Sequence, residues 1–220
     1  MRPVSRFGPH RWPVSLAHGP VGLRPIRRRD ARAWFEARGR NGGWTTPWDG
    51  TRPSDAAEDD FTFEQMVSRF NADARAGRSL PWLITWTEPG GRPVLAGQMT
   101  ISGIVWGSAR WGMAGYWVDR DLAGRGIAPT ALALAADHMF GPMGLHRLEV
   151  AIRPENTKSL RVVEKLGFRF EGTRPAYMHV DGAWRDHLMF ALHAEEVGPE
   201  GLIGRLPPPR TRATTGEDSS

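Results

Sequence analysis

Alternation of apolar and polar residues predicts strands in several parts of the chain. Residues 21–26 alternate over one short strand. Longer runs rich in β-branched and aromatic residues, bounded by turn residues, predict further strands. They cover residues 81–87, 93–105, 109–118, 148–152, 168–180 and 184–192. Asp181-Gly182 separates the last two runs, and because this dipeptide favours a tight turn, the two strands should form a hairpin.

An apolar repeat at helical spacing predicts four helices. They cover residues 31–40, 57–76, 125–140 and 157–166. Asp30 is placed to cap the first, while Gly77 and Gly167 follow the second and fourth, as glycine often does at a helix end. Gly and Pro interrupt residues 41–54, which predicts a loop. A central meander followed by strand–helix units is typical of one α+β domain.

The two ends of the chain lack such periodicity. Residues 1–19 are rich in Pro and Gly, and we expect an N-terminal arm that Trp12, Val14 and Leu16 attach to the body as a short edge strand. Residues 198–220 contain a Pro run and a Gly/Ser/Thr-rich end, which predicts a disordered C-terminal tail. The body, residues 20–197, has the size of one domain.

Composition and charge exclude several classes of protein. The chain has no cysteine, which rules out a disulfide scaffold and a cysteine nucleophile and suits a reducing compartment. No run of about 18 apolar residues occurs, so we expect no membrane association and a cytoplasmic protein. The net charge is +5, but the body holds 23 basic against 21 acidic residues, which argues against a nucleic-acid partner. Histidines at metal-ligand spacing are absent, so we expect no metal.

A glycine-rich turn between a strand and a helix is the first candidate site. Gly124 and Gly126 let the backbone approach a ligand, and the first N–H groups of the helix attract an anion such as pyrophosphate. The turn lacks the Gly-Lys-Ser/Thr of a P-loop and the third glycine of a dinucleotide fingerprint. The alternative is a tight turn that needs glycine for geometry alone.

A second candidate site spans the following strand and helix. Glu149 lies between Leu148 and Val150 and faces the opposite way, where it could act as a base for an ammonium nucleophile. The alternative is a solvated or arginine-paired strand residue. Asn156 and Ser159 stand at the start of the next helix, where Asn156 is also placed to be its N-cap.

Aromatic residues add candidates for substrate binding. Trp44 and Trp48 fall in the predicted loop, and exposed aromatic side chains on a loop favour a binding surface. Tyr116 and Tyr177, the only tyrosines, fall near the same region and could bind a substrate or donate a proton. A buried tyrosine with a backbone partner is the alternative for both.

Several of these segments together resemble a known family. The run AGRGIA at 123–128, N-x-x-S at 156–159 and EKLGF at 164–168 resemble the GNAT superfamily of acetyl-CoA-dependent N-acetyltransferases. LRP at 23–25, PW at 47–48, GYW at 115–117 and EGT…DGxWRD over 171–186 are similar to its RimJ/RimL-like branch, the ribosomal-protein-alanine N-acetyltransferases. The resemblance covers residues 20–193.

The resemblance implies a fold and a set of binding residues. The fold would be a GNAT fold, an α/β sandwich whose mixed, mostly antiparallel sheet splays into a V with helices on both faces. Acetyl-CoA would be the co-substrate, its pantetheine arm lying between the parted strands and its pyrophosphate at the glycine turn. The implied acetyl-CoA contacts are Trp117, Val118, Gly124, Arg125, Gly126, Ile127, Ala128, Asn156 and Ser159.

Two departures from the family pattern affect the implied chemistry. Ala123 replaces the usual Arg or Gln at the head of the loop, and Val163 replaces the Tyr that many members use to protonate the leaving thiolate. Ser159 or a water would then take that part, with Tyr116 as a further candidate. Glu149 matches the base of related enzymes, although it lies two residues further from Asn156 than in some of them.

The predicted function is acetyl transfer to a primary amine, most simply the N-terminal amine of a ribosomal or other protein. Trp44, Trp48 and Tyr177 would then bind the acceptor. A small amine or an antibiotic is the alternative acceptor. A non-catalytic module that binds CoA or nucleic acid is the alternative of a different class. The sequence leaves monomer and homodimer equally open.

Overall fold

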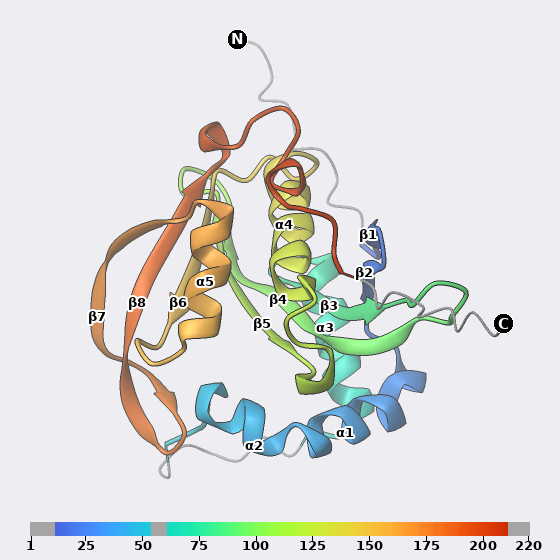
Figure 1. The fold of residues 1–220 in the computed structure, drawn as a ribbon. Coiled ribbons are helices and arrows are strands. Elements are labelled where there is room, and N and C mark those ends of the chain that lie inside the picture. Colours follow the sequence, from blue (N-terminus) through green and yellow to red (C-terminus); the bar gives the residue numbers. More distant parts are fainter. Residues whose placement is uncertain (1–11, 54–60, 211–220) are drawn as a thin grey trace, which may run out of the picture.

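One mixed sheet organises the chain in the computed structural model, which describes residues 12–53 and 61–210 (Figure 1). Its eight strands run in the order β1-β2-β3-β4-β5-β6-β8-β7. They are β1 (Leu16–His18), β2 (Val21–Pro25), β3 (Leu80–Trp86), β4 (Val94–Val105), β5 (Trp111–Val118), β6 (Arg147–Ile152), β7 (Arg169–Val180) and β8 (Ala183–His193). Neighbours are antiparallel except β5 and β6, which are parallel. The predicted α+β class with a mixed, mostly antiparallel sheet is confirmed.

Helices cover both faces of this sheet. They are α1 (Ala31–Arg40), α2 (Gly42–Thr45), α3 (Phe63–Arg75), α4 (Ile127–Phe140) and α5 (Thr157–Leu166). Short 3₁₀ turns are η1 (Arg28–Asp30), η2 (Thr46–Trp48), η3 (Arg120–Leu122), η4 (Ala194–Glu196) and η5 (Ile203–Arg205). Figure 1 shows α4 and α5 in front of the sheet, with α1 and α2 along its lower edge.

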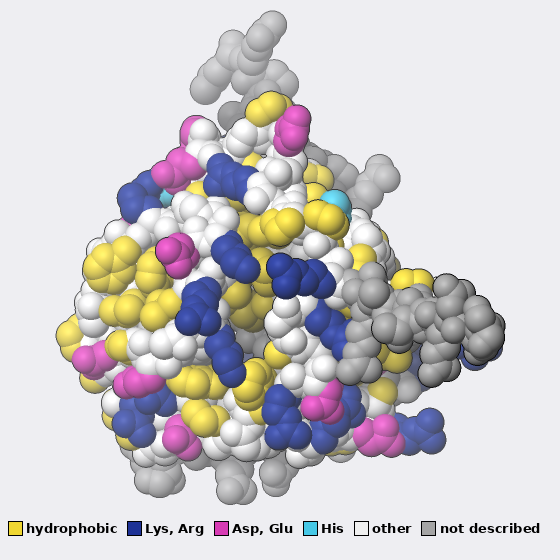
Figure 2. All heavy atoms as spheres, in the orientation of Figure 1, with side chains coloured by type: hydrophobic (Ala, Val, Ile, Leu, Met, Phe, Trp, Pro, Cys, Tyr) yellow, Lys and Arg dark blue, Asp and Glu magenta, His cyan; other side chains and the backbone are white. Residues whose placement is uncertain are grey.

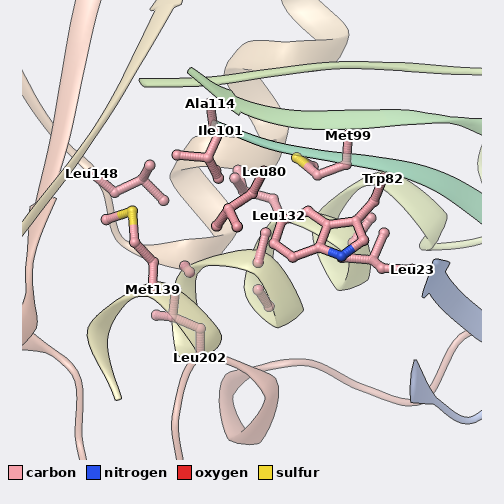
Figure 3. Close-up of a cluster of buried hydrophobic side chains, with 14 of the residues drawn as sticks. Leu23, Leu80, Trp82, Met99, Ile101, Ala114, Leu132, Met139, Leu148 and Leu202 are labelled. Atoms are coloured by element: carbon pink, nitrogen blue, oxygen red, sulfur yellow. The ribbon is translucent and has the colours of Figure 1, made fainter. Parts of the chain in front are cut away.

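Strand alternation explains the two cores. Leu80 and Trp82 of β3 pack with Leu132 and Met139 of α4 in the larger core (Figure 3). Leu83, which points to the other face, packs with Phe63 and Val67 of α3 in the smaller one. A period of two places successive side chains on opposite faces, so both faces of β3 are apolar and both are covered.

Two segments differ from the predicted elements. The 41–54 region contains α2 and η2, because Asn41 holds the chain in place: its Nδ2 donates to the Ala37 carbonyl at 2.8 Å and its Oδ1 accepts from the Arg120 N–H at 2.8 Å. The helix predicted over 57–76 begins at Phe63, after a capping box between Thr62 and Gln65. Positions 57–60 lie outside the described residues.

The C-terminal segment packs on the body, which corrects the expectation of a disordered tail for residues 198–210. Leu202 is fully buried in the larger core, and its N–H donates to the Asp137 carboxylate at 2.7 Å. Further on, the Arg210 N–H donates to the Arg125 carbonyl at 3.1 Å, which brings the segment to the predicted glycine turn. The predicted edge strand at the other end is present as β1, paired with β2.

The sheet divides between its two parallel strands. β5 pairs with β6 only from Trp111 to Ala114, opposite residues 147–150, whereas residues 115–118 remain paired with β4 alone. At this point β4 approaches closely through Gly97, where a Cβ would lie 2.1 Å from the Trp117 carbonyl oxygen. The free edge of residues 115–118 is the splayed, V-shaped opening that we predicted.

Candidate functional site

A cleft of about 890 Å³ lies at this opening. Its walls come from β4, β5, the glycine turn, the first turn of α4, one face of α5 and the region from α1 to η2. Figure 2 shows a hollow in this face of the molecule with Lys and Arg side chains around it. The cleft therefore joins the two candidate sites that the sequence places apart.

The glycine turn forms one end of the cleft. Gly124 and Gly126 have φ of 83° and 84°, a left-handed conformation that strains other residues, so both glycines are needed for geometry. Gly126 is the N-cap of α4, and Ile127 and Ala128 follow on the cleft wall. The first N–H groups of a helix have no acceptor within it, so they are available to an anion in the cleft.

Arg125 does not face the cleft. Its guanidinium pairs with Glu88 and lies 5.6 Å from the centre of the Trp86 ring, and Arg125 is not among the cleft-lining residues. The side chain of Arg125 therefore adds no charge to the cleft wall, and the acetyl-CoA contact that the resemblance implies for Arg125 would have to come from its backbone. The cations on the described wall are Arg38 of α1 and three residues that share one face of α5, Lys158, Arg161 and Lys165.

Trp44 joins the two walls at the middle of the cleft. Its indole N–H donates to the Val118 carbonyl at 3.1 Å, and the Lys158 ammonium lies 3.6 Å from the centre of its ring. Trp48 also lines the cleft and is 40% exposed. Both tryptophans thus lie on the predicted surface, while their role in binding an acceptor remains a prediction.

Tyr116, Asn156 and Ser159 meet where β5 faces the start of α5. The Asn156 Oδ1 accepts from the Ser159 N–H at 3.1 Å and caps α5, which leaves the Asn156 amide nitrogen for a ligand. The buried Tyr116 hydroxyl has no hydrogen-bond partner among the described residues. Burial raises the pKa of Tyr116 to about 12, and the nearby Ser159 hydroxyl offsets part of the rise without forming a hydrogen bond of good geometry.

Glu149 lies on the sheet face that carries the cleft, but it is not itself on the cleft wall. The register aligns Ser102, Met113 and Glu149 across β4, β5 and β6, and Ser102 lines the cleft. The Glu149 side chain is 10% exposed, and its Oε1 accepts from the Arg147 Nε at 2.8 Å. Its Oε2 is buried without a hydrogen bond among the described residues, 3.9 Å from Arg174. Glu149 is thus arginine-paired, and its role as base remains a prediction.

Tyr177 is not brought to the cleft. Its hydroxyl accepts from Arg174 at 3.0 Å, and its ring lies edge-on to His187 at 5.8 Å. Tyr177 is absent from the cleft wall, because it belongs to the hairpin end of β7, whose side chain contacts are local. The prediction that it binds the acceptor is therefore not supported by its position.

Several cleft residues escaped the sequence analysis although the sequence carries signals for them. Gln98, Thr100 and Ser102 alternate with apolar residues along β4 and form part of the cleft wall. Asp49 is the only carboxylate on the described wall, and its oxygens contact Arg38 at 2.6 and 3.4 Å. The alternation in β4 could have identified the first three, whereas the Asp49 contact depends on tertiary structure.

The described residues bear on two further expectations. They contain no group of three or more His, Cys, Asp or Glu that could hold a metal ion. Within the same part of the chain, no helix has the length and apolar character needed to cross a membrane.

The fold and the cleft are those of a GNAT acetyltransferase. The acetyltransferase (GNAT) domain matches residues 21–169, more than half of the chain, and the chain belongs to this family. Within the family it is of the RimJ-like kind, as the motifs predict. The solved structure of Mycobacterium smegmatis RimJ in complex with CoA-disulfide is 38% identical, with a TM-score of 0.77 over 88% of this chain and 93% of that one.

Two curated relatives are similar over shorter stretches. The probable N-acetyltransferase YjcK of Bacillus subtilis (strain 168) is 35% identical over 98 residues, which are 44% of this chain and 54% of YjcK. The [ribosomal protein uS5]-alanine N-acetyltransferase of Escherichia coli (strain K12) is 31% identical over 105 residues, 48% of this chain and 54% of that enzyme. The chain thus spans about half the length of the curated relatives it matches.

Proposed function

We propose that the chain transfers an acetyl group from acetyl-CoA to the N-terminal α-amine of a protein. GNAT enzymes use acetyl-CoA. The observation that carries the proposal is one continuous cleft, which runs from the glycine turn, past the free edge of β5, to the tryptophans of α2 and η2. Such a cleft can hold a long donor and an acceptor in contact, which lowers the entropic cost of their reaction.

The cleft offers each part of acetyl-CoA a partner. Backbone groups of Trp117 and Val118 on the free edge suit the amides of the pantetheine arm, although Trp44 already donates to the Val118 carbonyl. Gly124, Gly126, Ile127 and Ala128 suit the pyrophosphate through backbone N–H groups. Arg161 and Lys165 add positive charge on the facing wall.

One side chain beside the cleft and two on its wall could transfer protons in two directions. Glu149 would take the ammonium proton through a water, since it lies on the correct sheet face but off the cleft wall. The N–H near Val118 would bind the oxygen that becomes negative when the amine attacks the thioester carbon. Tyr116 is protonated near neutral pH, as any ordinary tyrosine is, and burial raises its pKa further, so it can donate to the departing thiolate together with Ser159.

Charge on the cleft wall separates two classes of acceptor. The described lining carries Arg38, Lys158, Arg161 and Lys165 against the single carboxylate of Asp49. A polyamine or aminoglycoside carries several positive charges, which such a wall repels. A protein N-terminus brings one ammonium, which favours the peptide acceptor. The E. coli relative named for uS5 alanine acetylation agrees with this choice.

A panel of acceptors tests the proposed function. Acetyl-CoA is incubated with the full chain and either an alanine-starting peptide, the same peptide with a blocked α-amine and a free lysine, spermidine or an aminoglycoside. Mass spectrometry should show acetylation of the first peptide only. Acetylated spermidine or aminoglycoside alone would establish the small-amine alternative, and no product from any acceptor would leave a non-catalytic CoA-binding module.

Glu149→Gln tests the proposed base. Removal of a general base typically costs about 100-fold or more in rate, so kcat should fall by about that factor while acetyl-CoA affinity is retained. Glu171→Gln is the matched control, because Glu171 pairs with the same Arg147 and does not line the cleft. Equal kcat values in wild type and Glu149→Gln would remove Glu149 from the mechanism.

A further inference from the structure

Asp49 is the single negative charge on the described wall of a basic cleft. It follows Trp48 at the end of η2, and the cleft wall next to it includes Thr45, Trp48 and Gly50. Glu149, the other acidic group considered above, does not reach this wall. An acceptor amine that enters the cleft as an ammonium ion therefore meets one carboxylate.

The segment that carries Asp49 is fixed at both ends. The Asp49 N–H donates to the Thr45 carbonyl at 3.0 Å, which ties it to α2. Before it, the Pro47 carbonyl accepts from Arg153 at 2.7 Å, and after it Gly50 forms a bridge with Val180 of β7. A group held in this way keeps its position when a ligand binds, so little ordering entropy is lost.

Asp49 retains the capacity to bind a further donor. Arg38 approaches Oδ2 at 2.6 Å but Oδ1 only at 3.4 Å. A carboxylate offers about four acceptor positions, of which the two Arg38 contacts occupy two. The side chain is 32% exposed, and Asp49 faces the cleft. Oδ1 is thus available to a donor that comes from the cleft.

The surrounding charges make this position selective. Arg38 is itself held against the Trp117 ring at 5.4 Å and the Trp34 ring at 5.9 Å, so its charge stays beside Asp49. Because Arg38 offsets much of the Asp49 charge, what Oδ1 offers an ammonium is mainly a hydrogen bond, and a ligand with several ammonium groups would also meet Arg38 and the cations of α5 on the same wall. An α-amino group has a pKa of about 8 and arrives mainly charged at neutral pH.

We propose that Asp49 binds the acceptor's N-terminal ammonium and positions it for deprotonation. This role rests on the proposed function. The acceptors it selects are protein N-termini that are unblocked and carry a single positive charge at the amine. Asp49 takes part in no bond making: the ammonium loses its proton to another group, and the resulting neutral amine and then amide no longer pair with the carboxylate. The acetylated product should therefore bind more weakly than the free N-terminus.

The test compares the binding of two peptides that differ only at the amine. Isothermal titration of the full chain uses an alanine-starting hexapeptide and its Nα-acetylated form. Wild type should bind the free peptide at least tenfold more tightly, and Asp49→Asn should bring the two affinities within about threefold. The acceptor KM should rise about tenfold or more in Asp49→Asn, while kcat and acetyl-CoA affinity change little. A preference for the free peptide that survives in Asp49→Asn would overturn the inference.

Two further variants separate binding from structure. Arg38→Gln removes the partner of Asp49 but leaves the Asp49 carboxylate, so this variant should still bind the free peptide more tightly than the acetylated one. If Arg38→Gln and Asp49→Asn lose this preference equally, the ion pair has a structural role and the proposal is refuted. Glu36→Gln, an exposed residue of the same helix α1, should match wild type. Because titration needs no turnover, failure of the proposed function appears separately, as absence of product in the acceptor panel.

Discussion

The buried hydroxyl of Tyr116 gives a prediction that needs no substrate. Burial raises the pKa of Tyr116 from 10 to about 12, which corresponds to about 2.7 kcal/mol at about 1.36 kcal/mol per pH unit. Above pH 10 the unfolded chain loses this proton while the folded chain keeps it. Stability from this group is therefore complete below pH 10 and is lost as the pH rises from about 10 to 12.

The assay uses the small number of tyrosines. Only Tyr116 and Tyr177 are present, so the ultraviolet absorbance of phenolate can be followed in wild type and in Tyr116→Phe. The difference between the two titrations is the ionisation of Tyr116, and its midpoint should lie near pH 12. Tyr116→Phe should also lose less stability than wild type between pH 10 and 12, by up to about 2.7 kcal/mol in urea unfolding.

Circular dichroism at each pH is the necessary control, because unfolding would expose the phenol. A Tyr116 midpoint near pH 10 in a chain that is still folded would refute the assignment of a buried hydroxyl. The proposed donation to the leaving thiolate would not be affected by that result, because a tyrosine with a pKa near 10 is still protonated at neutral pH.

Two more predictions concern the packing of the C-terminal segment and the charges around the cleft. Leu202→Ala should destabilise the chain by about 3 kcal/mol, because a fully buried leucine is lost from the larger core, and lower Tm by about 6–12 °C in calorimetry; a loss below about 1 kcal/mol would mean that the segment is not packed. Arg125→Ala should change the acetyl-CoA Kd by less than about twofold, because the Arg125 side chain pairs with Glu88 outside the cleft. Arg161→Ala, on the cleft wall, should raise the acetyl-CoA Kd about tenfold. Titration calorimetry checks both, and the reverse order would contradict the assignment.

Local signals in the sequence predicted most of the elements. Helices α1 and α5 begin and end where predicted, since their ends depend on nearby residues such as Asn156 and the left-handed Gly167. The strand boundaries agree within a few residues because alternation is local as well. Leu202 was missed because a single buried leucine in a Pro/Gly-rich segment has no periodicity, although its contacts with α4 give it a fixed place.

Directions of charged side chains could not be predicted in the same way. Arg125 turns to Glu88, 37 positions earlier in the chain, and this partner becomes adjacent only after the sheet forms. Asp49 and Arg38 meet in a similar manner across the bend between α1 and η2. Trp44 and Trp48 line the cleft, but in α2 and η2 rather than in the predicted loop, and the N–H contact of Trp44 with Val118 joins positions 74 apart.

The parting of β5 from β6 affects the mechanics of the whole chain. Among the described strands, four residue pairs from Trp111 to Ala114 connect the part of the sheet formed by β1–β5 with the part formed by β6–β8. Along the rest of this boundary, a donor molecule that bonds to one edge and touches α5 on the other side takes the place of a strand. Such a molecule would stabilise the two parts of the sheet against local opening. The backbone amides of residues 115–118 should then exchange their hydrogens more slowly when the donor is bound.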